Sequence, residues 1–153
     1  MPELSTLISQ IKKLHSTLLF VADKTFYWSP KDATIHFDKN ASGNEAGWSL
    51  IHETGHALLE HTRYYSDIEL VQMELAAWER AKEVASLLNV SIEEDHIQDC
   101  IDSYRDWLYK RSLCPHCDLC GVQIDKSVYT CVFCLQEWRV TNERFCRPYR
   151  KTV

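Results

Sequence analysis

The sequence predicts an α+β fold, with a mainly helical core, a small β-hairpin and a small C-terminal module rich in cysteine. Three observations support this. Several long segments carry apolar residues at helical spacing, a short segment near residue 30 has the pattern of two strands joined by a turn, and six of the seven cysteines lie between Cys114 and Cys146. At 153 residues, the chain has length for one domain and a small module, which we place at residues 1–112 and 113–153.

The N-terminal segment predicts an amphipathic helix over residues 1–20, with leucine and isoleucine on one face. Lys12 and Lys13 interrupt any signal-peptide core, and no segment is long and apolar enough for a membrane span. Aromatic and β-branched residues at 26–28 and 34–37, separated by a turn that contains proline, then predict a hairpin.

Three further helices are expected, over residues 45–63, 67–88 and from Glu94 to about Arg111. The last begins with a capping box formed by Ser91 and Glu94. The middle helix has one apolar stripe, formed by Leu70, Ala77, Ala81, Val84, Ala85 and Leu88.

The most informative motif is the pentad His52-Glu53-Thr54-Gly55-His56, within the first of these three helices. Residues four apart on a helix point the same way, one turn apart, so both imidazoles can bind one Zn²⁺. Glu53 can then act as the general base of a hydrolase. The motif therefore predicts a catalytic zinc site.

A catalytic zinc needs a third protein ligand, and helical phase selects among the candidates. Continuing the helix through His61 would put it on the face opposite to His52, which predicts a solvated histidine. Glu74 falls instead in the middle of the apolar stripe of the next helix, where a buried carboxylate needs a cation. We expect Glu74 to be the third ligand. The alternative is an ion pair between Glu74 and an arginine or lysine.

At these residues the chain resembles the ImmA/IrrE-type metallopeptidases. In that family H-E-x-x-H precedes a helix with an E-x-x-A-[NW] motif, and here Glu74 is followed by Ala77 and Trp78. The resemblance covers roughly residues 25–88. It implies a zincin-like, gluzincin-type fold in which Glu53 is the base and Glu74 the third ligand.

The resemblance also has implications for substrate and location. It implies that the strand Ile35–Asp38, just before the metal helix, binds the substrate backbone in extended form. It further implies an intracellular protein substrate, such as a helix-turn-helix repressor. The cysteines, which no export signal accompanies, predict a reducing compartment and therefore a cytoplasmic protein.

The C-terminal cysteines predict a zinc ribbon. Two C-x-x-C knuckles are separated by the hairpin pattern of residues 122–129, the spacing of a structural zinc site. Cys120 also stands in a C-x-x-C knuckle, so it competes with Cys114 for one ligand position. His116 and Cys146 are spare donors, whereas Cys100 is expected to pack inertly in a helix. The expected ligands are Cys114, Cys117, Cys131 and Cys134.

Charge divides the chain unevenly: residues 1–106 carry a net charge of −9 and residues 107–153 carry +4. The basic residues Arg144, Arg147 and Arg150 alternate with aromatic residues near the C-terminus. This tail has two interpretations. It contacts nucleic-acid phosphate or an acidic protein, or it packs back onto the acidic N-terminal part.

Together these patterns predict a zinc-dependent endopeptidase that holds one catalytic and one structural zinc. The alternative is a non-catalytic regulatory or nucleic-acid-binding protein with a ribbon tail, whose histidine site is structural. The intact Glu53 favours the enzyme, since a structural site has no use for a base.

Overall fold

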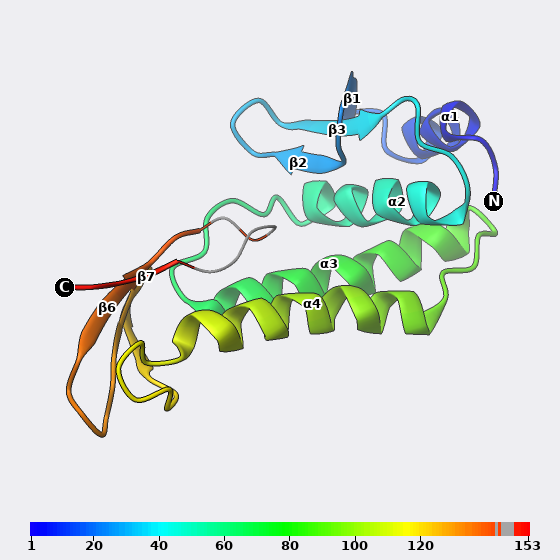
Figure 1. The fold of residues 1–153 in the computed structure, drawn as a ribbon. Helices are drawn as coiled ribbons and strands as arrows, with labels where there is room; N and C mark the ends of the chain where they lie inside the picture. Colours follow the sequence, from blue (N-terminus) through cyan, green and yellow to red (C-terminus); the bar gives the residue numbers. More distant parts are fainter. Residues whose placement is uncertain (143, 145–148) are drawn as a thin grey trace. The chain divides into compact units, whose positions relative to one another are not determined.

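The computed structural model describes residues 1–142, 144 and 149–153. In these residues the chain has an α+β fold with four helices and two small sheets, as predicted (Figure 1). The chain forms two compact units. The first comprises Met1–Arg63 and Met73–Ile97, and the second comprises Tyr64–Gln72 and Gln98–Val153. The predicted domain boundary at residue 112 stays a prediction.

The first unit begins with helix α1, Leu4–Leu14, which buries Leu7 and Ile11. The prediction of a helix up to residue 20 is wrong, because the backbone leaves helical angles at His15. The apolar residues that follow belong to strand β1, Leu19–Asp23, which pairs with another strand. Short apolar runs fit both periodicities, and here the tertiary pairing decides between them.

The predicted hairpin is confirmed as strands β2, Tyr27–Ser29, and β3, Thr34–Asp38. The sheet order is β1-β3-β2, with β1 parallel and β2 antiparallel to β3. Strand β3 is therefore central, and both of its edges are already paired. A substrate strand cannot add to a strand that is paired on both sides, so the prediction that Ile35–Asp38 binds the substrate backbone is wrong.

Helix α2, Asn44–Leu58, packs against β2, β3 and α1. It carries the H-E-x-x-H motif, but the prediction that it continues to residue 63 is wrong. The chain leaves the helix beyond Leu59, and Glu60 takes a left-handed conformation with φ of 51°.

Helices α3, Asp67–Leu87, and α4, Glu94–Ser112, begin and end close to their predicted positions. The predicted apolar stripe is buried from Leu70 to Ala85, whereas Leu88 follows the end of α3 and is half-buried. Both helices contribute residues to each of the two units.

The second unit contains a four-stranded antiparallel sheet in the order β4-β5-β6-β7. Strands β4 and β5 form the predicted hairpin, whereas β7 is additional. The small hydrophobic core beside this sheet consists of Cys114, Tyr129, Cys131, Trp138 and Val140. The strands span Val122–Asp125, Val128–Thr130, Glu137–Val140 and Arg150–Thr152.

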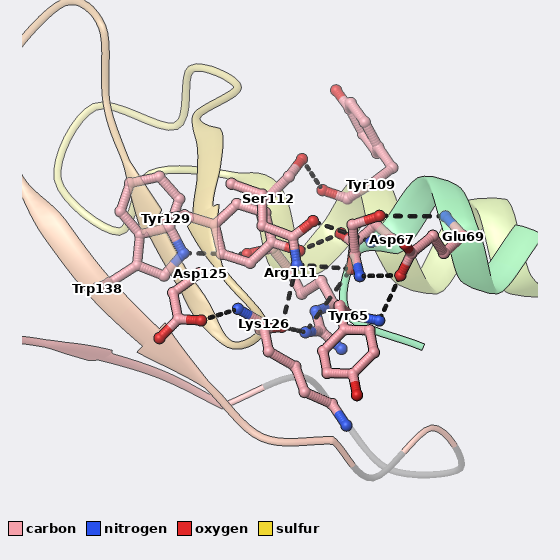
Figure 2. A network of polar contacts seen from close by, with 12 residues as sticks. Tyr65, Asp67, Glu69, Tyr109, Arg111, Ser112, Asp125, Lys126, Tyr129 and Trp138 are labelled. Carbon is pink, nitrogen blue, oxygen red and sulfur yellow. Dashed lines mark hydrogen bonds and ion pairs between the residues drawn. The ribbon is translucent and has the colours of Figure 1, made fainter. Parts of the chain in front are cut away.

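A buried arginine, Arg111, connects this sheet to the helical residues of the same unit (Figure 2). Its guanidinium lies 4.5 Å from the ring centre of Trp107 and donates to the Lys126 carbonyl at 3.2 Å. It also lies 3.8 Å from the carboxylate of Asp67, which accepts a hydrogen bond from the Tyr129 hydroxyl. This network fixes the start of α3 and the end of α4 against the β4–β5 hairpin.

Candidate metal centres

The first centre lies between α2 and α3 and consists of His52, His56 and Glu74, which are 5–9% exposed. Nε2 of His52 lies 3.1 Å from Nε2 of His56 and 3.2 Å from a carboxylate oxygen of Glu74. The same oxygen lies 3.6 Å from Nε2 of His56. The predicted third ligand thus lies beside both histidines. In the described residues the ion-pair partners of Glu74 are these histidines, not an arginine or lysine.

Gly55 brings the two helices close enough for this arrangement. A Cβ atom at Gly55 would lie 2.3 Å from the carbonyl oxygen of Ala77, one turn beyond Glu74 on α3. No side chain fits in that space, so the backbone of α3 approaches α2 directly. Sequence reasoning missed this role, although a glycine in the middle of a helix is a signal of close approach.

The electrostatics of the centre favour a cation. Burial alone would raise the pKa of Glu74, but hydrogen bonds and charge from His52 and His56 outweigh it, and the pKa of Glu74 falls far below its usual range. Burial alone would lower the pKa of His56, but Glu74 and the charge of Glu53 raise it. The carboxylate therefore stays ionised inside the protein and attracts positive charge.

The spacing of the three donors fits a metal ion. A tetrahedral ion with bonds of about 2.0–2.1 Å to nitrogen and oxygen separates its ligand atoms by about 3.3 Å. The observed separations are 3.1, 3.2 and 3.6 Å. The centre can therefore bind a metal ion through two imidazoles and one carboxylate.

Glu53, on the turn of α2 that carries both histidines, contacts strand β2. Its Oε2 accepts a hydrogen bond of 2.7 Å from the backbone N–H of Trp28. The indole N–H of Trp28 donates in turn to the carbonyl of His61 at 2.8 Å. Trp28 thus connects the predicted base with the segment that follows α2, a role that the sequence did not suggest.

The prediction that places His61 on the opposite face, away from the site, is wrong, and its side chain is half-buried rather than fully solvated. Its Nδ1 lies 2.8 Å from Nδ1 of His56, and the two rings pack edge to face with centroids 4.9 Å apart. Helical phase does not apply, because α2 ends before His61. Burial and the neighbouring His56 lower the pKa of His61 despite the charge of Glu74.

Trp78 supports the other histidine. Its ring stacks on His52 with centroids 4.1 Å apart and an interplanar angle of 26°. Within the described part of the chain, neither Nδ1 of His52 nor the indole nitrogen of Trp78 has a hydrogen-bond partner. The two Nδ1 atoms therefore differ: that of His56 faces His61, whereas that of His52 has no such partner in the described residues and its ring packs on Trp78.

The second centre is the cluster of Cys114, Cys117, Cys131 and Cys134. Their sulfur atoms lie 3.6 Å apart in the pair Cys114–Cys134, and 3.5 and 3.7 Å from Cys117 to Cys131 and Cys134. These distances are far too long for a disulfide, in which the sulfur atoms are about 2.05 Å apart. They are close to the roughly 3.8 Å between thiolates around a tetrahedral ion at 2.3 Å.

The knuckle backbone favours thiolates in this cluster. Amide groups of Cys134 and Phe133 lower the pKa of Cys131 to about 6. The Leu119 amide lowers the pKa of Cys117, but burial and the other three thiols outweigh it and raise this pKa to about 12. Thus one thiolate forms readily and a second is opposed unless a cation joins them, which is consistent with a metal site.

The remaining predicted donors have other environments. Cys120, the alternative to Cys114, is exposed and lies outside the cluster, as does His116. Cys100 is half-buried in α4. Cys146 lies outside the described residues.

Two of the three predicted tail arginines contact the second unit itself. Arg144 lies over the Tyr104 ring at 3.7 Å and donates to the Ser103 hydroxyl. Arg150 donates to the Leu113 carbonyl at 2.7 Å. Arg147 lies outside the described residues.

Comparison with models of protein families, with curated proteins and with solved structures gave no match. Among the described residues, no helix has the length and apolar character needed to cross a membrane.

Proposed function

We propose that the protein is a zinc-dependent endopeptidase. The observation that carries this proposal is the grouping of His52, His56 and Glu74 beside Glu53. Two imidazoles and one carboxylate are the ligand set of catalytic zinc sites in several peptidases, which leave one position open for substrate. Four thiolates are typical of structural zinc, so we assign that role to the cysteine cluster.

The proposed chemistry needs a metal ion and a base. A bound Zn²⁺ supplies Lewis acidity, which polarises the scissile carbonyl and makes an attacking water more acidic. Glu53 takes the proton from that water and later delivers it to the leaving amine. The bond from the Trp28 N–H to Oε2 holds this carboxylate in one orientation, and Oε1 takes no part in that bond.

We also propose that the substrate binds in extended form along the outer edge of β2. The Trp28 N–H donates to Glu53, so this residue directs its backbone groups away from β3. Apart from the Trp28 N–H, which already donates to Glu53, the outer edge of β2 has no strand partner among the described residues, and an extended peptide can add to such an edge. This edge lies beside the proposed base, as an endopeptidase requires.

The resemblance to ImmA/IrrE-type metallopeptidases extends the proposal to substrate and location. It rests on the two motifs at residues 52–56 and 74–78. On this basis the substrate is a cytoplasmic protein such as a helix-turn-helix repressor.

A second candidate function is a non-catalytic binding protein with two structural metal sites and, through its basic tail, a nucleic-acid partner. The low exposure of the three ligands, 5–9%, favours it, because catalytic sites must admit substrate.

Proteolysis by the zinc-loaded protein and by its Glu53→Gln variant distinguishes the two functions. The probes are helix-turn-helix proteins encoded beside this chain, together with whole-proteome mapping of new N-termini. We expect cleavage that falls by at least about 10²-fold in Glu53→Gln, because an amide cannot accept the proton. Equal zinc content in both proteins is the control. Cleavage that survives the substitution, or no cleavage by the zinc-loaded wild type, would contradict the proposal.

A further inference from the structure

The turn that ends α2 folds the chain back against the last turn of that helix. The N–H of His61 donates to the carbonyl of His56 at 3.1 Å, and the N–H of Glu60 donates to that of Ala57 at 3.1 Å. Together with the left-handed conformation of Glu60, these bonds form a Schellman motif. The motif fixes the backbone of His61 five residues after His56 and independently of side chains.

The side chain of His61 then meets the outer nitrogen of a proposed metal ligand. Nε2 of His56 faces His52 and Glu74, so it is the nitrogen available to a metal. Its Nδ1 lies 2.8 Å from Nδ1 of His61. Two ring nitrogens at this distance share one proton, and a neutral imidazole that binds metal through Nε2 carries its proton on Nδ1.

We propose that His61 is a positioning residue for the metal ligand His56. Its Nδ1 accepts a hydrogen bond from the His56 Nδ1–H, which fixes the tautomer and the ring orientation that direct Nε2 toward the metal. Ligating histidines almost always donate their second N–H to such a partner, usually a carboxylate or a carbonyl. Here a second imidazole has that role. The inference rests on the metal site of the proposed function and deepens it.

The position of His61 is secured from a second element. The indole N–H of Trp28, in β2, donates to the His61 carbonyl at 2.8 Å, while the Trp28 backbone donates to Glu53. One residue therefore holds both the proposed base and the partner of a ligand. His52 has no equivalent partner within the described residues and instead stacks on Trp78. The two histidine ligands should thus respond differently to changes around them.

The test is the zinc affinity of the full-length protein, measured by competition with a chromophoric chelator. We expect His61→Ala to weaken the histidine site by about 10–100-fold, the range for outer-shell partners of metal ligands. His61→Asn should restore affinity close to the wild type, since its amide oxygen can replace Nδ1 as the acceptor. His15→Ala is the matched control, because His15 also lies within three residues of a helix C-terminus but outside the metal site.

Spectra of the Co²⁺-substituted protein identify the site that changes. His61→Ala should alter the ligand-field bands of the nitrogen and oxygen site and leave the thiolate bands of the cysteine site unchanged. Unchanged affinity in His61→Ala, or equal weakening in His61→Ala and His61→Asn, overturns the role of His61 while leaving the proposed function intact. A wild type that binds metal only at the cysteines overturns the proposed function, and the role of His61 with it.

Discussion

Replacing Gly55 by alanine should weaken metal binding at the histidine site strongly while it lowers the stability of the fold only slightly. The added Cβ would lie 2.3 Å from the carbonyl oxygen of Ala77, where ordinary contact begins at 3.4 Å. The obstacle is backbone of α3, so α2 and α3 must move apart by about 1 Å. Metal–ligand distances tolerate changes of only about 0.2 Å. The shift should therefore withdraw Glu74 from His52 and His56.

The two expected effects differ in size. Overpacking lowers the free energy of unfolding by about 1–3 kcal/mol, but alanine in place of glycine inside a helix raises it by about 1 kcal/mol. The net loss of stability should be about 2 kcal/mol or less. Zinc affinity at the histidine site should fall by more than about 100-fold, because even outer-shell changes cost about 10–100-fold.

Gly47 provides the matched control within the same helix. A Cβ atom there would meet the sulfur of Met1 at 2.5 Å, and this flexible side chain can move away. Gly47→Ala should therefore keep zinc affinity and gain slightly in stability. The assays are chelator competition, helix content by circular dichroism and thermal unfolding. If Gly55→Ala binds zinc as tightly as Gly47→Ala, the metal site does not depend on the close approach of α2 and α3 at Gly55.

Two further predictions concern the second unit. Cys131→Ser should lose one metal ion and unfold the sheet β4–β7, since structural zinc contributes about 10–16 kcal/mol to the folding of such modules. Cys120→Ser is the control: Cys120 lies outside the cluster, so neither metal content nor hydrogen exchange should change. Tyr129→Phe should destabilise the protein by about 1.5–3 kcal/mol in urea unfolding, because the hydroxyl donates to the charged Asp67. Burial and Asp67 raise the pKa of Tyr129, so this stabilisation is complete below pH of about 10 and is lost above it. The difference between wild type and Tyr129→Phe should therefore shrink at alkaline pH, and a constant difference would contradict the assignment.

The sequence predicted what depends on local periodicity and spacing. The phase of α3 placed Glu74 on a buried stripe, and paired knuckles located the cysteine cluster. The sequence could not choose between Cys114 and Cys120, because both complete a C-x-x-C motif and only the folded chain separates their sulfur atoms.

Features that depend on chain reversal or on distant pairing were missed. Helical phase put His61 on the wrong side because it assumed a helix beyond Leu58, whereas a left-handed Glu60 ends it without a glycine signal. Strand β1 looked like the end of a helix, since its pairing with β3 is not encoded in the spacing of its apolar residues. The bond from Trp28 to Glu53 joins residues far apart in sequence, so no local pattern could predict it.

Zinc content per chain, by elemental analysis of the wild type and Glu74→Ala, tests the central claim most directly. Two separate centres, with three and four ligands, predict two zinc ions in the wild type. They predict one in Glu74→Ala after brief exposure to a chelator, because the cysteine site retains its ion. One zinc ion in the wild type, unchanged in Glu74→Ala, would contradict a metal site at His52, His56 and Glu74.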